Sequence, residues 1–538
     1  MTDTIFITTS IPYVNGAPHV GFAWELVLAD VLARYHRARG RRVRFLTGTD
    51  DNSLKNVRAA EAEGADTAAF VRARSDRFVQ LGRALGLSND DFIRTAFDPR
   101  HAPAVERLWR ACDAAGDVYR SSYRGAYCVG CERFFAPHEL AEGGCPEHDT
   151  PLERIDEENY FFRLGRHQGE IDRLLQSGEL RIWPDVYRGE AYGWVEAGLA
   201  DFSISRSTAR ARGWGVGVPD EPGQIVYVWF DALANYISAL GYAGGAPALD
   251  EFWDHGARRI HVIGKNVTRF HCIYWPAILA SAGLRAPSDV VVHGFLTVDG
   301  RKIGKSLGNG VDPFELVERF GADRLRHYLL RHFPLGRDGD FSTAGLVHAA
   351  NDELADQLGN LLQRVLVLLE QNTGGVVPAT ASEDSLLGGS LAEAARRAAA
   401  GARTELERCD PQSALAEVFA FVRACNLQLS RTEPWKLARR ARESRDPVER
   451  AALDAACQGV LADAARGLLW AAALLEPFLP DAAARIAAAF GAAAPGAAPA
   501  PAPTLPEVYA DVPPEWSRLG RGAQIRRPDV LFSRLASD

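Results

Sequence analysis

The chain has 538 residues, a net charge of −8 and eight cysteines, and 47% of its residues are hydrophobic. This length exceeds what a single hydrophobic core usually serves, so we expect roughly two to four domains. No run of about 18 or more apolar residues occurs, which excludes a helix that spans a membrane. The N-terminus also lacks the pattern of a secretory signal, so we expect a cytoplasmic protein.

The N-terminal region predicts a βαβ unit. Thr4–Thr9 is an apolar run typical of a buried strand, Phe22–Ala38 has the pattern of a helix that ends at Gly40, and Val43–Thr47 is a second apolar strand. A strand, a helix and a further strand in this order predict a parallel sheet. We therefore expect an α/β fold of the doubly wound, Rossmann type.

The rest of the chain predicts an insertion, a return to the α/β pattern and a helical region. Residues 114–222 hold the cysteine cluster and many turn residues, so we expect an insertion there. Strands are expected at Ile225–Trp229, Ile260–Gly264 and Val290–Phe295, with a helix at Thr268–Ala282. From about residue 342 to 489 the pattern is helical, followed by an Ala/Pro/Gly-rich linker and an apolar tail that we expect to pack back.

Two short segments are candidates for phosphate binding. His19 and Gly21 lie in the turn before the first helix, where free N–H groups and a partial positive charge suit a phosphate. Lys302 and Lys305 stand three apart in a glycine-containing loop after the last strand, where they can fold over a triphosphate. Taken alone, each segment also fits an ordinary surface histidine or a solvated basic loop.

Four residues have the spacing of a zinc site. Two residues separate Cys128 from Cys131, and two separate Cys145 from His148, with glycines beside both pairs. Three thiolates and one imidazole fill a tetrahedral Zn²⁺ shell and leave no open position. The pattern therefore predicts a structural Zn²⁺, one per chain, and the alternative is a set of unpaired thiols with an incidental histidine.

Together the two phosphate-binding segments resemble the His-Ile-Gly-His and Lys-Met-Ser-Lys-Ser signatures of class I aminoacyl-tRNA synthetases. Further segments narrow the resemblance to the methionyl-tRNA synthetase family, namely Ile11–Gly16, Thr47–Asp50, Tyr227–Ala232 and Ile263–Lys265. The resemblance extends from about Ile5 to Trp470. It implies ATP-dependent activation of L-methionine, with Mg²⁺ on the ATP, and transfer to the 3′ end of methionine tRNA, including the initiator tRNA.

The resemblance also implies roles for individual residues. It assigns catalysis to His19, Lys302 and Lys305, and ATP binding to these three with Gly21, Gly264 and Asn266. It places the substrate ammonium on Asp50 and the methionine side chain among Ile11, Tyr13, Trp229, Tyr236, His271 and Trp275. It assigns the reading of the anticodon to Asn360, Arg364 and Trp435, and its zinc knuckle matches the cysteine spacing.

The implied architecture is an α/β Rossmann-type catalytic domain with a zinc-knuckle connective insertion, followed by an all-α anticodon-binding helix bundle. We expect the Rossmann domain at residues 1–113 and 223–296, the insertion at 114–222, the signature loop with a stem-contact region at 297–341, the helix bundle at 342–490, and the linker and tail at 491–538. The chain ends without an appended oligonucleotide-binding domain of the kind that dimerises some family members, so we expect a monomer.

The sequence departs from the family pattern on the nucleotide side. Phe22 replaces the second histidine of the first signature, Gly304 replaces the serine of the second, Asn266 replaces an aspartate, and Asp51, Asn52 and Ser53 replace Glu-His-Gly. The alternative is therefore a divergent paralogue that activates methionine or an analogue for a non-tRNA acceptor, or an RNA-binding protein without activity. The ligase is favoured by the residues that are retained, which are Lys302, Lys305, Asn360, Arg364 and Trp435.

Overall fold

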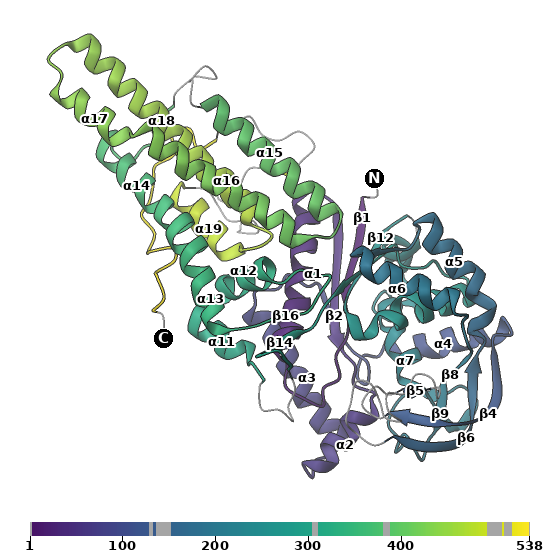
Figure 1. Ribbon diagram of the computed structural model, residues 1–538. Helices are drawn as coiled ribbons and strands as arrows, with labels where there is room; N and C mark the ends of the chain where they lie inside the picture. Colours follow the sequence, from purple (N-terminus) through teal and green to yellow (C-terminus); the bar gives the residue numbers. More distant parts are fainter. Residues whose placement is uncertain are drawn as a thin grey trace. The chain divides into compact units, whose positions relative to one another are not determined.

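The computed structural model describes residues 3–128, 133–135, 152–254, 256–303, 310–379, 388–491, 508–509 and 519–536 (Figure 1). The chain forms two compact units. The first unit comprises Met1–Ala29, Arg42–Arg83 and Asn89–Gly294. The second unit comprises Asp30–Arg41, Ala84–Ser88 and Phe295–Asp538.

The first unit is built on a six-stranded sheet in which every pairing is parallel. The strand order is β3 (Asp91–Arg94), β2 (Arg42–Thr49), β1 (Thr4–Thr9), β12 (Arg258–Gly264), β13 (Asp289–His293) and β7 (Arg181–Trp183). Phe6 packs into the same core as Leu108 of α4 (His101–Ala114), while its neighbours Ile5 and Ile7 are buried on the opposite face. Burial on both faces explains why the strands are continuous apolar runs.

Side-chain hydrogen bonds lock the register of the three central strands. Thr8 lies opposite His261 in the β1–β12 pair, and its Oγ1 is 2.7 Å from the Nδ1 of that histidine. The Oγ1 atoms of Thr9 and Thr47 are also 2.7 Å apart, between β1 and β2. A slip of one residue would separate these pairs and turn every side chain to the other face, so the register is strongly specified.

Most of the predicted elements of the sheet are confirmed. The strand Thr4–Thr9 is found as expected, and the first helix begins slightly earlier than predicted, as α1 (Val20–Ala38). Gly40 has a φ of 72°, the left-handed conformation that ends a helix. Two further helices, α2 (Leu54–Ala62) and α3 (Thr67–Ala84), follow β2.

Two predictions in the second half of the first unit are wrong in detail. The strand expected at Ile225–Trp229 is β11 (Glu221–Val226), which pairs antiparallel with β9 (Ser205–Ser207) and β10 (Gly217–Val218) and lies outside the main sheet. The remainder of that apolar run is helix α7 (Val228–Leu233), because short apolar runs fit buried helices and strands equally well.

The second wrong detail concerns the helix expected at Thr268–Ala282. It is divided into a π-helical segment, Phe270–Tyr274, and α10 (Trp275–Ser281). Residues 228–239 form α7 and then α8 (Asn235–Ser238).

The region predicted as an insertion is mainly antiparallel. Strands β5 (Arg133–Phe135), β4 (Val118–Cys128), β6 (Glu153–Phe162) and β8 (Phe202–Ser203) form a four-stranded sheet in this order. Helices α5 (Gln168–Ser177) and α6 (Asp185–Glu196) follow β6 in the chain, on either side of β7. The antiparallel pairing and the short turns explain why the α/β rhythm of the sequence breaks in this region.

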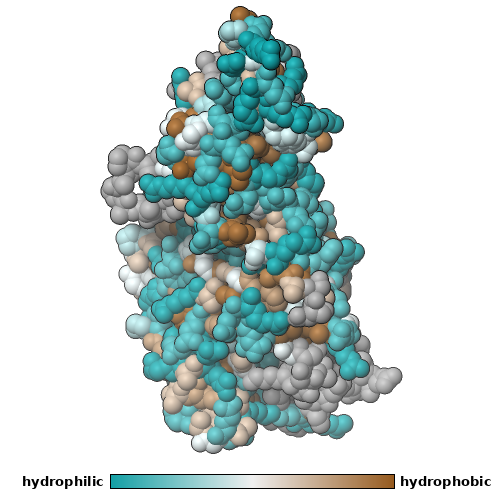
Figure 2. Space-filling model, turned by 90° about the vertical axis from the view of Figure 1, so that its left-hand side faces the viewer, coloured by the Kyte–Doolittle hydropathy of each residue, from teal (hydrophilic) through white to brown (hydrophobic). Residues whose placement is uncertain are grey.

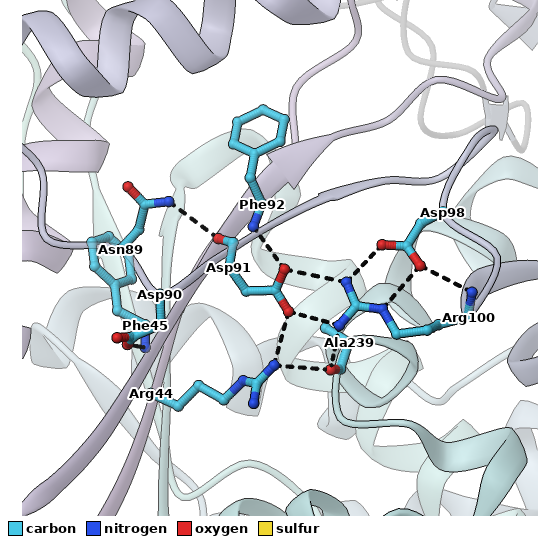
Figure 3. A network of polar contacts seen from close by, with 9 residues as sticks. All are labelled: Arg44, Phe45, Asn89, Asp90, Asp91, Phe92, Asp98, Arg100 and Ala239. Carbon is cyan, nitrogen blue, oxygen red and sulfur yellow. Dashed lines mark hydrogen bonds and ion pairs between the residues drawn. The ribbon is translucent and has the colours of Figure 1, made fainter.

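A polar network ties the edge of the main sheet to the helix that follows it (Figure 3). The Asp91 carboxylate on β3 accepts hydrogen bonds from Arg44 of β2, at 2.9 Å, and from Arg100, at 2.8 Å. Burial disfavours the charge of Asp91, but hydrogen bonds and charge from Arg100, and then from Arg44, outweigh burial and lower the pKa of its carboxyl group. Both arginines also donate to the Ala239 carbonyl, which follows α8.

The second unit contains a small three-stranded sheet and a larger helical region. Strands β14 (Leu296–Val298), β15 (Arg301–Lys302) and β16 (Gly339–Asp340) form a three-stranded sheet. The helices are α11 (Pro313–Phe320), α12 (Ala322–His332), α13 (Thr343–Ala349), a π-helical segment (Ala350–Gly359), α14 (Asn360–Thr373), α15 (Gly388–Glu407), α16 (Pro411–Thr432), α17 (Pro434–Glu443), α18 (Pro447–Leu475) and α19 (Pro480–Ala489). The predicted helical C-terminal region is thus confirmed.

Aspartate–proline pairs start three of these helices. The side chains of Asp312, Asp410 and Asp446 each accept a hydrogen bond from a backbone N–H of the first turn. The proline that follows each aspartate occupies the first helical position, where its missing N–H costs nothing and its fixed φ already suits a helix. The local sequence therefore specifies where these three helices begin.

The C-terminal half of α1 is held within the second unit by buried charge. Asp30 lies 2.8 Å from Arg326, which is fully buried and donates to the backbone carbonyls of Pro477 and Phe478. Burial disfavours the charge of Asp30, but Arg326 and Arg34 outweigh burial and lower the pKa of its carboxyl group.

The described part of the C-terminal tail runs along the helices of the second unit. Ile525 donates its N–H to the Gly375 carbonyl at 2.8 Å, and Arg485 of α19 donates to the Leu531 carbonyl at 3.0 Å. Leu531 and Phe532 are buried. The tail therefore covers apolar surface of this unit.

The exposed surface of the described residues is mainly polar. The face drawn in Figure 2 is largely hydrophilic, with hydrophobic areas scattered among polar ones. The exposed large hydrophobic residues are Val186, Val376, Leu427, Trp435, Val448 and Val530. Among the described helices, none has the length and apolar character needed to cross a membrane.

The Asp91 network predicts an acid-dependent loss of stability. Replacing Asp91 by Asn deprives Arg44 and Arg100 of their shared charge and should lower the free energy of unfolding by about 1–3 kcal/mol at neutral pH. Because the pKa of Asp91 is lowered in the folded state, its contribution is present above the unfolded pKa of about 3.9 and is lost as pH falls through the folded pKa.

Urea unfolding of the wild type and of Asp91→Asn between neutral and acidic pH should therefore give stabilities that converge as the pH falls. The control is Asp220→Asn, which removes an exposed partner of Arg110 and should change the midpoint very little. A constant difference between wild type and Asp91→Asn across the pH range would contradict the assignment.

Candidate active site

The candidate site lies at the carboxyl ends of the central strands. Strand β1 pairs with β2 on one side and with β12 on the other, so the strand order reverses at β1. Ligands of open parallel sheets bind at this type of switch point, in the crevice beyond the carboxyl ends of the strands. The segments that leave the ends of β1, β2 and β12 contain Tyr13, Asp50 and Asn266 respectively.

Asp50 follows β2 directly and is buried against the segment that follows β1. Its N–H donates to the Pro12 carbonyl at 2.9 Å, and Asp50 forms a bridge with Tyr13. The Asn52 N–H donates to the Asp50 carboxylate at 3.2 Å, which orients it. Burial raises the pKa of the neighbouring Asp51 to about 7. Asp51 therefore carries less negative charge near neutral pH than an ordinary aspartate.

Tyr236, His271 and Trp275 form a buried aromatic cluster. The Tyr236 hydroxyl lies 2.7 Å from His271 Nε2, and the ring centroids of Tyr236 and Trp275 are 6.0 Å apart. His271 Nδ1 is 2.9 Å from the Val267 carbonyl, which can only accept, so Nδ1 carries the proton and Nε2 accepts from Tyr236. Burial lowers the pKa of His271 to about 4, so the imidazole is neutral at physiological pH.

Trp229 and Tyr13 form a second aromatic pair that is only partly buried. The Trp229 ring stacks on Phe270 with centroids 3.8 Å apart, and it meets Tyr13 edge-on at 6.3 Å. Lys55 of α2 places its Nζ 4.3 Å from the centroid of the Tyr13 ring. Ile11 is partly buried and packs against the apolar core of the first unit. Together these residues give an apolar, polarisable surface within the same unit as Asp50.

His19 is exposed immediately before α1. Its carbonyl accepts the N–H groups of Phe22 and Ala23, which begins the helix, and its Nδ1 accepts the Gly21 N–H at 3.1 Å. In the neutral ring Nδ1 is therefore an acceptor and Nε2 carries the proton. A Cβ at position 21 would lie 3.0 Å from the His19 ring, so a larger residue there would press on the ring in this position.

Gly264 and Asn266 follow β12 closely. A Cβ on Gly264 would lie 3.0 Å from Asn266 Oδ1 and 3.6 Å from the ring of His293, so a side chain would crowd both. Asn266 itself is exposed. The ring of His293 is held by Glu25 of α1, which lies 3.0 Å from His293 Nε2 and accepts the Ser10 N–H at 2.8 Å.

Two residues that depart from the family pattern, Phe22 and Asn52, make buried contacts within the first unit. Phe22 is buried and meets Phe78 of α3 edge-on at 5.5 Å, so it belongs to the core. Asn52 is buried and donates from Nδ2 to Asp231 of α7 at 2.9 Å. Sequence reasoning did not anticipate the partners of either residue, because Phe78 and Asp231 lie far away in the chain and follow no local pattern.

The remaining candidate residues of the nucleotide side are less fully described. Lys302 ends β15 in the second unit, where it lies opposite Thr297. Lys305 and Gly304 lie outside the described residues.

The zinc candidates fall mostly outside the described residues. Cys128 is buried at the end of β4 and forms no disulfide with another described cysteine. Cys131, Cys145 and His148 lie in segments that the structure does not describe. Among the residues that are described, no group of three or more possible ligands is close enough to hold a metal ion.

The three residues assigned to the anticodon come from two helices of the second unit. Asn360 and Arg364 are one turn apart on α14, and Asn360 is exposed. Trp435 lies at the start of α17 with 37% of its surface exposed, and the Arg364 guanidinium carbon is 5.7 Å from the centroid of its ring. The fold thus brings together an arginine and a tryptophan that are remote in sequence.

Comparisons with known proteins identify the family of this chain. The family model for class I (M) tRNA synthetases matches residues 5–156 and 149–366. The curated methionine–tRNA ligase of Brucella melitensis is 37% identical over 98% of this chain and 97% of its own length. That of Mycobacterium leprae is 39% identical over 89% of this chain and 88% of its own length.

A solved structure extends the similarity to three dimensions. The methionyl-tRNA synthetase of Mycobacterium tuberculosis in complex with methionyl-adenylate is 36% identical, with a TM-score of 0.88. The match covers 99% of this chain and 100% of that one. This chain therefore belongs to the methionine–tRNA ligase family of class I tRNA synthetases.

Proposed function

We propose that this chain is a methionine–tRNA ligase, which activates L-methionine with ATP and transfers it to the 3′ end of methionine tRNA, including the initiator. The observation that carries the proposal is the presence, in a chain of this family, of a buried carboxylate at the switch point of the sheet and of a buried aromatic cluster in the same unit. Relatives that cover nearly the whole chain are methionine–tRNA ligases, and one solved relative holds methionyl-adenylate.

Methionine binds through both of its ends. The substrate ammonium pairs with Asp50, a charge-assisted contact in a site sheltered from water. The side chain contacts the aromatic rings of Tyr13, Trp229, Tyr236 and Trp275, whose edges favour a polarisable sulfur. Because the pKa of His271 is lowered, this imidazole adds no positive charge beside the thioether, and Ile11 adds apolar contact.

ATP binds at the start of α1 and at the end of β12. The Nε2–H of His19 is the donor to a phosphate, and the positive end of the α1 dipole adds to the attraction. Gly264 and Asn266 bind the nucleoside, and Lys302 and Lys305 neutralise charge on the phosphates. Mg²⁺ bound with ATP supplies further neutralisation of the phosphate charge.

The first reaction is attack of the methionine carboxylate on the α-phosphorus, which forms the acyl-phosphate bond and releases pyrophosphate. Charge builds on the phosphate oxygens, and His19, Lys302 and Lys305 supply donors aimed at that charge. In the second reaction a terminal ribose hydroxyl of the tRNA attacks the carbonyl carbon of methionyl-adenylate. An ester bond forms and AMP leaves.

The tRNA is selected by its anticodon on the second unit. Trp435 offers a face for a splayed base, and Asn360 and Arg364 offer hydrogen-bond donors, which suits the recognition of single-stranded RNA. We also propose that the domain boundaries are those expected from the sequence and that one protomer acts alone in the cytoplasm. Support for a monomer is that one chain supplies both the amino-acid pocket and the anticodon residues.

A structural Zn²⁺ completes the insertion. Cys128, Cys131, Cys145 and His148 supply three thiolates and one imidazole, a donor set that closes a tetrahedral shell. The burial of Cys128 at the end of β4 fits a ligand in a shielded structural site.

Activity with methionine tests the proposal directly. The purified chain should catalyse methionine-dependent exchange of labelled pyrophosphate into ATP and should charge methionine tRNA. The variant His19→Asn keeps an acceptor for the Gly21 N–H but loses the imidazole donor, so exchange should fall by roughly 10²–10³-fold. His348→Asn, at an exposed histidine of α13, is the control and should match the wild type. Exchange without charging would indicate another acceptor, and the absence of both activities would refute the proposal.

The anticodon residues should affect charging alone. Trp435→Ala removes a stacking face worth about 1–3 kcal/mol, so the KM for methionine tRNA should rise by roughly 5- to 150-fold, while pyrophosphate exchange stays unchanged. Val448→Ala, at an exposed residue of α18, is the matched control. Equal KM values for Trp435→Ala and the wild type would show that the anticodon is read elsewhere.

Metal analysis tests the zinc proposal. The purified chain should contain about one Zn²⁺, and Cys145→Ser should lose most of it, because a structural site needs all four ligands. Cys457→Ser, at a cysteine of α18 outside the cluster, should retain the metal. Equal zinc content in both variants would exclude the assigned ligands.

A further inference from the structure

Asn52 joins the two parts of the amino-acid pocket. Its backbone N–H donates to the Asp50 carboxylate at 3.2 Å, and its side-chain Nδ2 donates to Asp231 Oδ2 at 2.9 Å. Asp231 lies on α7, two residues after Trp229. One buried residue thus contacts both the carboxylate assigned to the substrate ammonium and the helix that carries the aromatic wall.

The contact continues through a buried chain of hydrogen bonds. Asp231 Oδ1 lies 2.8 Å from His101 Nε2, and His101 Nδ1 lies 3.1 Å from the Ser238 hydroxyl on α8. Ser238 donates its only hydroxyl proton to the Ala234 carbonyl at 2.7 Å, so its oxygen accepts from His101 Nδ1–H.

The same helical segment is held at its far end. The Ala239 carbonyl accepts from Arg100, the neighbour of His101 in the chain, at 3.0 Å (Figure 3). Tyr236 lies between this anchor and the one at Asp231. The segment that carries Trp229 and Tyr236 is therefore fixed at two points to the strands and turns that position Asp50.

Polar contacts in a low-dielectric interior are strong and directional, and a broken one leaves a buried group without a partner. The contacts of Asn52 therefore hold Asp50, which is assigned to the substrate ammonium, in place relative to α7, which carries Trp229. On the basis of the function proposed above, we propose that Asn52 is a positioning residue that determines the length of side chain the pocket accepts.

The test compares three amino acids by pyrophosphate exchange. L-ethionine is one methylene longer than methionine, whereas L-norleucine has the same length and lacks only the sulfur. In Asn52→Ala the KM for methionine should rise roughly tenfold with little change in kcat, since a hydrogen bond to a charged group is lost. The preference for methionine over ethionine should fall roughly tenfold, while that over norleucine should remain as in the wild type.

Two further variants make the test specific. Asn52→His retains an N–H donor toward Asp231 and should restore most of the discrimination against ethionine. Asn159→Ala removes a similarly buried amide, on β6, which has no hydrogen-bond partner among the described residues, and should leave all three substrates unaffected. If Asn52→Ala does not fold, Ser238→Ala, which removes the acceptor at the end of the chain, should shift the ethionine preference in the same direction.

The outcomes separate this inference from the proposed function. A wild type without methionine-dependent exchange would refute the function itself. An active wild type whose Asn52→Ala variant discriminates against ethionine as before, even with a lower melting temperature, would overturn the positioning role and leave Asn52 a purely structural residue. Equal losses for ethionine and norleucine discrimination would also overturn it, because length would then not be the quantity that Asn52 controls.

Discussion

The parallel pairing of β1 between β2 and β12 is the constraint on which the site depends. It brings together segments that are more than two hundred residues apart, as the pairing of Thr8 with His261 shows. The two side-chain hydrogen bonds that cross these strands fix the register, and the register decides which residues leave the strand ends beside one another. Asp50, Tyr13 and Asn266 share one edge of the sheet for this reason alone.

Buried and partly buried ion pairs fix the positions of helices and strands that are distant in sequence. Asp91 with two arginines, Asp231 with His101, and Asp30 with Arg326 are all buried or partly buried pairs that join elements distant in sequence. Such pairs add little net stability over a well-packed apolar contact, but a missing partner is costly. They therefore hold elements in one arrangement and tolerate few substitutions, which suits the elements that carry a binding pocket.

The substitutions on the nucleotide side have a packing explanation. Phe22 faces Phe78 in the core, and Asn52 faces Asp231, so each has found a partner within the first unit. Neither residue leaves a buried polar group unsatisfied through its own side chain. The function proposed for this chain consequently relies on His19, Lys302 and Lys305 for phosphate binding, and Phe22 contributes to the stability of the fold.

The amino-acid sequence by itself determined the elements whose signals are local. Continuous apolar runs marked β1 and β12, aspartate–proline pairs started α11, α16 and α18, and ordered motifs revealed the family. The run at Ile225–Trp229 was assigned wrongly in part, because so short an apolar run fits both a buried strand and a buried helix until its neighbours are known.

Only the tertiary structure decided which side chains meet. The contact of Arg364 with Trp435, the bond from Asn52 to Asp231 and the neutral tautomer of His271 each depend on partners that no spacing in the chain announces. These contacts follow from strand register and helix packing, which are collective properties of the folded chain, whereas propensity and capping act within a few residues. Local sequence signals therefore identify candidate residues of the site, whereas long-range packing sets the distances between these residues.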